Sequence, residues 1–528
     1  MPKILINEKD RTSPGNASSY SNYTVLIPGF RGIATATEKT RVEPDTNGVY
    51  EFNSAKKFEE TIGLIAPDQE IQTTDGTTTV YHYGNQMAYE LLNMGYKILY
   101  KPIQAVSELV DDSFWEVFKD KANYDFRFIT HGLLKSFSTN DVELANLEAR
   151  LTLVNKAIEE LNRIDAGFSS DTDKDTEYQE IKENFEGFYD ENALTPGYYV
   201  DIMAANLGTA NEKTMLSEQI ASFVVNGISN TSFNQVNKLI ADLAKYVNST
   251  DDAEGSGRGD CVALVELDEK AYVNNTTGTR AESLIINEVN KLSGSTIDLT
   301  NGKYCAVTVP SVVYSMPENE KFNSNTKFPG AFHYLACFVN SLNLGFKEWY
   351  AAAGYTRGVS SYTVAHTSVK LGEIAINALE PRTLVSGGPK FACNVVANFR
   401  GSYYLWGNRT AHELAEDGDL VASHFLNIRQ LCTTIKKQLY VACRRFTFDP
   451  NSDTLWVNFV NAIRPTLEEM KADQGIRDYK ILKVVEDSPK KATLKAKIRI
   501  IPIEAVEDFD LEISLEDSFG ETATVVTE

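Results

Sequence analysis

The side chains best suited to acid–base catalysis or metal binding in this chain are its 6 histidines, and their spacing matches no metal-ligand motif. They are His82, His131, His333, His366, His412 and His424. His131 is the best catalytic candidate, because Thr130-His131-Gly132 follows a predicted strand. A buried structural histidine is the preferred interpretation. A nucleophile–histidine–acid arrangement stays open, since its members converge in space and not in sequence, although no Gly-x-Ser-x-Gly elbow accompanies it.

Two polar loops have the composition of ligand-binding loops without the required pattern. The glycine-rich run 255–260 precedes a predicted strand, whereas a phosphate-binding loop follows one. We interpret it as a flexible connection, and the Arg-Gly-Asp inside it as a chance tripeptide. The acidic run 171–177 lacks the ligand pattern and closing glutamate of a calcium loop, so a solvated loop is preferred. The sequence has no P-loop. We therefore predict no catalytic site, no cofactor and no metal.

The charge and the cysteines narrow the class of protein further. A formal net charge of −22 argues against general nucleic-acid binding, which needs a cationic surface. The sequence has no apolar run long enough for a membrane span and no signal-peptide pattern at its start, so we expect assembly in a cytoplasm. The 6 cysteines form no C-x-x-C pair, which favours buried free thiols. They are Cys261, Cys305, Cys337, Cys393, Cys432 and Cys443.

Apolar periodicity then indicates the elements that position these side chains. Strands are expected at 23–30, 96–101, 124–130, 261–267 and 304–309, and helices at 52–63, 87–93, 141–161, 232–248 and 280–292. Ser54 is the expected cap of the first helix, with Phe58 and Ile62 on its buried face. Apolar strands joined by helices predict an α/β sheet covered on both faces. The acidic segment 165–195 is poor in aliphatic residues and predicts a surface insertion.

A long helix over 424–445 is predicted to open the C-terminal third. Its inward side chains would be Ile428, Leu431, Cys432, Ile435, Leu439 and Ala442. Its exposed side would carry Arg429, Lys436, Lys437, Arg444 and Arg445. Two interpretations of these cations stand side by side. One is a solvated face with its charges near the helix C-terminus, and the other is a docking surface for an acidic partner.

The remaining elements are a second helix and two short strands. The helix is expected over 454–473, capped by Asp453, kinked at Pro465 and ended by Gly475. Alternating apolar residues at 495–502 and 509–515 predict half-buried strands.

Both ends of the chain carry short β-prone segments outside the predicted domains. They are Lys3–Ile6 and Thr522–Thr527. Fraying termini are one interpretation. Strand addition to the sheet edge of a neighbouring subunit is the other, because it supplies backbone hydrogen bonds while the connecting linker stays free.

Several segments follow one another in a characteristic order. In the C-terminal third they are Leu405–Thr410 (Leu-Trp-Gly-Asn-Arg-Thr), Phe425–Leu431, Phe446–Asn451, Leu455-Trp456, Gly475-Ile476 and Ile501–Glu504. Earlier segments are Val25–Phe30, Phe58–Gly63, Tyr96–Tyr100, Val309–Ser311, Phe328–Ala331 and Lys347–Gly354. In this order they resemble the contractile tail sheath family of myophages, contractile bacteriocins and type VI secretion, whose signature is Trp-Gly-x-Arg-Thr. Residues 105–260 match no part of the family, and its Pro-Gly-rich opening is present only as Ser13-Pro14-Gly15.

The resemblance implies a multidomain fold, α/β and α+β, with a defined domain order. The implied parts are an N-terminal β-arm (1–20), an N-terminal sheath domain segment (21–104), an outer α/β region with an insertion (105–260), the remainder of the α/β sheath domain (261–370), an inner, tube-facing α+β domain (371–517) and a C-terminal β-arm (518–528). Terminal β-arms complete the inner domain of neighbouring subunits. The implied strand-exchange residues are Ile4, Leu5, Ile6, Thr524, Val525 and Val526. The basic helix, with Arg429, Lys436, Lys437, Arg444 and Arg445, would dock on the tube.

The function implied by the resemblance is structural and not enzymatic. Subunits would stack as hexameric rings around a tail tube and contract to drive tube penetration and viral genome ejection. The implied partners are copies of itself, the tail tube protein, and baseplate and tail terminator proteins, without nucleic acid or membrane. The implied location is the virion tail. The alternatives are the sheath of a non-viral contractile injection system and a soluble α/β hydrolase-type enzyme using His131.

Overall fold

The computed structural model describes most of the chain outside its two ends and one long internal segment. The described residues are 23–32, 41–65, 70–73, 76–79, 82–104, 108–109, 112–134, 233–248, 257–273, 280–294, 297–298, 302–315, 325–415, 420–483, 494, 496–503 and 505. The predicted helix 141–161, insertion 165–195, strand 509–515 and both terminal arms lie outside them. The chain divides into two compact units, Met1–Thr447 and Phe448–Glu528.

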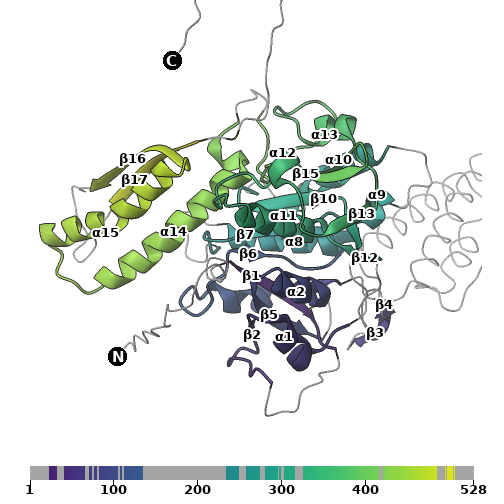
Figure 1. Ribbon diagram of the computed structural model, residues 1–528, viewed down its shortest axis with the longest axis horizontal. Coiled ribbons are helices and arrows are strands. Elements are labelled where there is room, and N and C mark those ends of the chain that lie inside the picture. The colour runs from purple at the N-terminus through teal and green to yellow at the C-terminus, as the bar shows by residue number, and fades with distance from the viewer. Residues whose placement is uncertain are drawn as a thin grey trace, which may run out of the picture. The chain divides into compact units, whose positions relative to one another are not determined.

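An eight-stranded sheet forms the centre of the first unit (Figure 1). Its strands, in spatial order, are β15 (Ser402–Trp406), β14 (Asn394–Phe399), β10 (Cys305–Val309), β7 (Val262–Val265), β6 (Phe128–Ile129), β1 (Thr24–Phe30), β5 (Lys97–Ile103) and β2 (Tyr50–Phe52). Strands β14 to β5 pair in parallel, while β15 and β2 pair antiparallel at the edges. The order reverses between β1 and β6, as in a doubly wound α/β sheet.

Successive side chains of the central strands enter two separate hydrophobic cores, one on each face of the sheet. Val25 and Ile27 belong to one core, and Leu26 between them belongs to the other. Strand β7 alternates in the same way. This period of two on strands that are buried throughout confirms the predicted α/β sheet covered on both faces.

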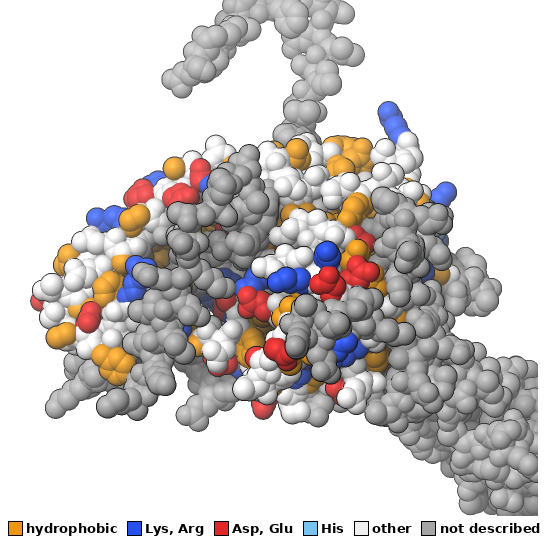
Figure 2. Space-filling view, turned by 60° about the horizontal axis from the view of Figure 1, so that its bottom comes forward, with side chains coloured by type: hydrophobic (Ala, Val, Ile, Leu, Met, Phe, Trp, Pro, Cys, Tyr) orange, Lys and Arg blue, Asp and Glu red, His pale blue; other side chains and the backbone are white. Residues whose placement is uncertain are grey.

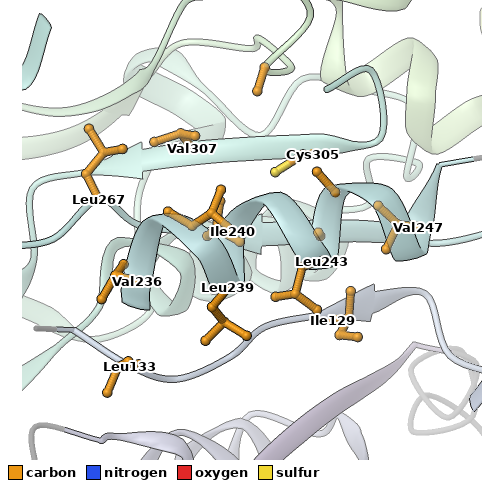
Figure 3. Packing of buried hydrophobic residues seen from close by; sticks show 14 of the residues in the cluster. Ile129, Leu133, Val236, Leu239, Ile240, Leu243, Val247, Leu267, Cys305 and Val307 are labelled. Atoms are coloured by element: carbon orange, nitrogen blue, oxygen red, sulfur yellow. The ribbon is translucent and has the colours of Figure 1, made fainter. Parts of the chain in front are cut away.

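Helices and short turns surround the sheet of the first unit, and most of them contribute buried residues to its two cores. They are α1 (Ala55–Ile62), α2 (Gly84–Asn93), α3 (Asp112–Glu116), the 3₁₀ turn η4 (Val117–Lys119), α8 (Phe233–Val247), α9 (Lys270–Val273), α10 (Ala281–Leu292), α11 (Gly330–Asn343), α12 (Gly354–Arg357), α13 (Glu373–Leu379), η5 (Ala422–His424) and α14 (Leu426–Phe446). Figure 3 shows α8 lying on the sheet, with Leu239, Ile240 and Leu243 packed between Ile129 and Val307. Since these residues recur every three or four positions, one face of α8 is buried.

Smaller sheets complete the first unit. They are β12–β11–β13 (Asn325–Phe328, Val312–Ser315, Thr363–Thr367), β3–β4 (Glu70–Thr73, Gly76–Thr79) and β8–β9 (Ser293–Gly294, Ile297–Asp298).

Most predicted elements with strong periodicity are confirmed, and one is much shorter than expected. Strand β1, helix α8 and helix α10 lie within one or two residues of their predicted bounds. The strand predicted at 124–130 is reduced to Phe128–Ile129. The segment 371–447 contributes β14 and β15 to the large sheet, and the first compact unit extends to Thr447.

The second unit consists of helix α15 (Asp453–Ala472) and the antiparallel pair β16 (Ile476–Lys483) and β17 (Ala496–Pro502). The predicted cap at Asp453 is wrong, because Ser452 is the N-cap and its hydroxyl accepts the Leu455 N–H at 3.3 Å. Gln474, at φ +58°, takes the left-handed position after the helix, and Gly475 donates to the Met470 carbonyl. Pro465 lies inside the helix, which continues to Ala472.

One face of α15 forms the small core of this unit. Its buried residues are Leu455, Phe459, Ile463, Leu467 and Met470. Ile476 at the start of β16 is also fully buried.

Candidate functional site

Helix α14, which the sequence predicts to dock on a partner, is held at its first turn by the signature segment Leu405–Thr410. Gly407 has φ +128°, and a Cβ there would meet the Asn394 Cα at 2.9 Å, so the turn requires glycine. Asn408 follows and exchanges hydrogen bonds with Asn427 of α14, from Nδ2 to Oδ1 at 2.7 Å and from the Asn427 N–H to the Asn408 Oδ1 at 3.0 Å. Arg409 is 2 % exposed and stacks over the Phe425 ring at 4.8 Å. The signature therefore joins β15 to the start of α14.

Three of the five predicted surface cations of α14 are engaged inside the first unit, so the prediction of one exposed basic face is wrong. Arg429 is 8 % exposed, with its guanidinium 4.4 Å from the centre of the Tyr304 ring. The Lys436 ammonium donates to the Gly259 carbonyl at 2.9 Å and to the Tyr304 hydroxyl at 2.5 Å. The stacking of a cation on an aromatic ring explains this burial, since it replaces part of the lost hydration.

Lys437 makes the third internal contact of the helix. Its ammonium donates to the Phe126 carbonyl at 2.9 Å and contacts the Asp125 carboxylate. Only Arg444 and Arg445 of the predicted set are exposed. They lie in the last turn, where cations favour the helix dipole.

The C-terminal half of α14 is the exposed part of the helix. Tyr440 and Val441 are 39 % and 54 % exposed there, beside Cys443. On the face shown in Figure 2, cationic and acidic side chains of the described residues lie next to one another. The candidate docking surface on α14 consists of Arg444 and Arg445 beside the exposed Tyr440 and Val441.

The catalytic candidate His131 is completely buried and faces a second buried histidine, His82. The His131 Nδ1 accepts the Leu133 N–H at 3.0 Å, and the His82 Nδ1 accepts the Gly84 N–H at 3.3 Å. Burial lowers the pKa of His82 to about 4 and, together with the neighbouring His82, that of His131 to about 3. Both rings are therefore neutral at pH 7 and serve as acceptors for backbone groups, which supports the structural interpretation.

Three buried acidic residues, Glu266, Asp268 and Glu269, follow β7 at the edge of the sheet where the parallel strands end. Glu269 accepts from the Ser311 hydroxyl at 2.6 Å and from the Lys327 ammonium at 2.8 Å. Burial raises the pKa of Glu266 well above its ordinary value. Within the described ranges, no three His, Cys, Asp or Glu side chains are grouped so that they could hold a metal ion.

The Arg-Gly-Asp tripeptide is a structural element and not an exposed loop. Arg258 is 2 % exposed and donates to the carbonyls of Phe118 and Tyr124 at 2.6 and 2.5 Å, and to Asp260 at 2.7 Å. Residues 257–260 therefore fix the chain before β7, in contrast to the predicted flexible connection. Four cysteines are buried, as expected, whereas Cys443 is exposed and Cys432 lies between the two classes.

The sheet of the second unit has free edges in the part of the chain that the structure describes. Strands β16 and β17 pair only with each other there. Ile501 and Leu482 are 53 % and 40 % exposed. No described helix is long and apolar enough to span a membrane.

Comparisons with known proteins give no match to a family model and no match among curated proteins. Among solved structures, the chain is similar to one described as the anti-feeding prophage baseplate, 6-fold symmetrised, at 11% identity and a TM-score of 0.49, covering 98% of this chain and 99% of that one. It is also similar to one described as an extracellular contractile injection system, PVC sheath complex in the contracted state, at 11% identity and a TM-score of 0.46, covering 98% of each chain.

Proposed function

We propose that this chain is the sheath subunit of a phage-type contractile tail, a structural protein of the virion. Its copies polymerise as stacked hexameric rings around a tail tube, and their contraction drives tube penetration and genome ejection. The observation that carries the proposal is the second unit, where a sheet of two strands on one helix leaves both edges free in the described residues. The sequence resemblance assigns strand exchange to this part of the chain.

The physical reason is the marginal stability of a two-stranded sheet. Such a sheet is barely stable in water without further strands, and here one helix provides its core. Strands added from neighbouring subunits supply backbone hydrogen bonds along both edges and cover Leu482 and Ile501. We propose residues 1–20 and 518–528 as the donated arms, acting through Ile4–Ile6 and Thr524–Val526. The inner domain is then an α+β domain completed only in the assembly.

Deletion of residues 518–528 tests the strand exchange. The shortened subunit should remain folded by circular dichroism but form no tubes in negative-stain electron microscopy. Two substitutions at one position test whether backbone pairing is required. Val525→Pro removes a backbone N–H donor and should prevent tube formation. Val525→Thr keeps that donor and a high β propensity, and should allow tubes to form. Normal tubes from the deletion would contradict the proposal.

Docking on the tube is proposed for Arg444 and Arg445 alone, because Lys436 and Lys437 have partners within the first unit. The double change Arg444→Glu and Arg445→Glu should weaken co-assembly with the tube protein, most clearly at low salt. Lys56→Glu is the control, since the Lys56 side chain is 83% exposed on α1. Equal co-assembly of both variants would place the docking surface elsewhere. Baseplate and tail terminator proteins are the proposed partners at the two ends.

Two alternatives remain distinguishable. In a non-viral contractile injection system the neighbouring genes would encode effectors, whereas capsid and terminase genes accompany a phage tail. A hydrolase-type enzyme is disfavoured because His131 is 0% exposed, so a substrate has no access to its ring. A stable monomer with measurable turnover would contradict the sheath proposal.

A further inference from the structure

The amino ends of neighbouring strands in the large sheet meet the first half of α14 (Figure 1). Tyr23 precedes β1, Arg127 precedes β6, Gly259 lies just before β7 and Tyr304 precedes β10. Each of them contacts α14 or a side chain that binds it. The helix therefore lies across the sheet edge from β1 to β10, in contact with several strands.

Arg127 is the central contact of this edge. Its Nε donates to the Gln430 Oε1 at 2.7 Å, and its Nη2 donates to the Gln430 carbonyl and the Thr434 hydroxyl, both at 2.9 Å. Thr434 also donates to Glu348 at 3.0 Å, and the Tyr23 hydroxyl donates to the same carboxylate at 3.2 Å. Arg127 is 5 % exposed, so these charge-assisted bonds lie where water competes little.

Two lysines further along α14, Lys436 and Lys437, also connect the helix to residues that precede strands of the large sheet. Lys436 binds in front of β7 and β10 through the Gly259 carbonyl and the Tyr304 hydroxyl. Lys437 binds in front of β6 through the Phe126 carbonyl. Each ammonium bridges the helix to backbone or side-chain oxygens of the sheet, and both stems lie in partly buried positions.

Beyond Lys437 most residues of α14 are exposed to solvent. Residues 440, 441 and 443–445 are exposed, and the compact unit ends at Thr447. The next residue, Phe448, has φ +76° and is 87 % exposed. A left-handed phenylalanine without packing around its ring is a strained connection, because only glycine adopts that region freely. The connection between α14 and α15 thus consists of exposed residues, 447–451, with one strained backbone position at Phe448.

We propose that α14 is a rigid lever fused to the α/β unit, with Arg127, Lys436 and Lys437 as the residues that position it, and that movement between the two units is confined to the connection 447–451. If the chain is a sheath subunit, as proposed above, load on the second unit reaches the large sheet through these contacts. The lever itself is a property of the free chain and does not depend on assembly.

Hydrogen exchange of the full-length free chain tests the positioning residues. Arg127→Met should speed exchange of the amides at 430–437 at least tenfold, while amides of β1 keep their protection. Arg445→Met is the matched control, because it removes an exposed cation of the same helix, and should leave these rates unchanged. Lys436→Met should act like Arg127→Met, and Lys436→Arg should restore much of the protection. Equal rates in wild type, Arg127→Met and Lys436→Met would overturn the proposal, and Lys436→Met serves alone if Arg127→Met fails to fold.

Spin-label distances test the location of the movement. With Cys432→Ala as background, labels on the exposed Cys443 and on Lys56→Cys should give one narrow distance, because both sites belong to the first unit. Labels on Cys443 and Asn461→Cys should give a broad distribution that Phe448→Pro shifts, since proline excludes positive φ. A narrow second distance, unchanged by Phe448→Pro, would contradict the hinge.

These outcomes are independent of the sheath proposal. If purified wild type forms no rings or tubes, the proposed function fails while the exchange and distance results still stand. If tubes form but the exchange rates do not respond to Arg127→Met and Lys436→Met, the lever fails and the sheath proposal is unaffected.

Discussion

Acid should destabilise the first unit through the buried pair His82 and His131. Both side chains are neutral in the folded state at pH 5.5, because burial lowers their pKa values to about 4 and about 3. In the unfolded chain each has its ordinary pKa of 6.5 and binds a proton at this pH. Since the unfolded state binds more protons, stability rises with pH, is fully present above 6.5 and is lost as the pH falls toward the folded pKa values.

The size of the loss depends mainly on the unfolded state. At pH 5.5 the protonated form of an unfolded histidine exceeds the neutral form about tenfold, so each histidine loses between about 1 and 2 kcal/mol of stability relative to pH 8. The pair therefore contributes a loss of about 3 kcal/mol. Buried Glu266 acts in the opposite sense, because its raised pKa adds stability at low pH that is lost as the pH rises. The dependence of wild-type stability on pH is consequently a sum over all such groups, and it includes His333, whose pKa burial lowers to about 3.

Substitutions of His82 and His131 isolate the contribution of these two side chains to the pH dependence of stability. His131→Asn and His82→Asn keep an acceptor for the backbone N–H that each ring now binds. Each should lower the difference in unfolding free energy between pH 8 and pH 5.5 by between about 1 and 2 kcal/mol. The assay is urea unfolding at both pH values, with pH 5.5 chosen to stay above the pI of about 4.9, where the chain would aggregate. Ile129→Val is the control, because it removes a buried methylene beside the pair and should cost about 1 kcal/mol at both pH values. A pH difference that is the same in wild type and both histidine variants would refute the reasoning.

Three further substitutions should change stability, each measured by urea unfolding of the full chain. Phe58→Ala should lower the free energy of unfolding by about 3–5 kcal/mol, because the Phe58 ring is 0 % exposed and packs edge-on against the Tyr100 ring, with 5.0 Å between the ring centres. Ser452→Ala should cost about 1 kcal/mol in the second unit through loss of the α15 cap. Gln474→Gly should instead stabilise that unit by about 1 kcal/mol, since it relieves the left-handed backbone at φ +58°. An unchanged midpoint for any of them would contradict its stated cause.

Elements with strong local periodicity could be predicted from the sequence, because the pattern alone decides which face is buried. Helix α8 is an example: its apolar residues recur at helical spacing and all enter one core. Strand β6 was overestimated for a different reason. Residues 124–128 alternate apolar and polar side chains as a strand does. The Asp125 carboxylate, the Phe126 carbonyl and the Arg127 guanidinium, however, bind α14 over 300 positions later in the chain. Such partners cannot be read from a local window.

The same limit applies to the candidate site and to the domain boundary. Arg429 lies beside the apolar stripe of α14, where sequence favours an exposed cation, and only the fold places Tyr304 beneath it. Asn394 pairs with Thr308 in the parallel register of β14 and β10, and that long-range pairing assigns 371–447 to the first unit. The signal that the sequence did offer is the dipeptide Gly407-Asn408 in the segment Leu405–Thr410, because a glycine followed by asparagine after a strand indicates a turn.

If the chain is a sheath subunit that docks through Arg444 and Arg445, as proposed above, salt should affect self-assembly and tube docking in opposite directions. The chain carries a formal net charge of −22, and buried Arg127, Arg258 and Arg429 place part of its positive charge in the interior. Free subunits therefore repel one another at low ionic strength, and screening within about 10 Å at 0.1 M salt weakens that repulsion. Docking through exposed Arg444 and Arg445 on an acidic partner weakens under the same screening. Raising the salt from about 0.05 to about 0.5 M should thus lower the concentration at which tubes form, followed by light scattering, while it reduces binding to isolated tube. If both processes strengthen or both weaken, either the repulsion between subunits or the arginine contact is not electrostatic in origin.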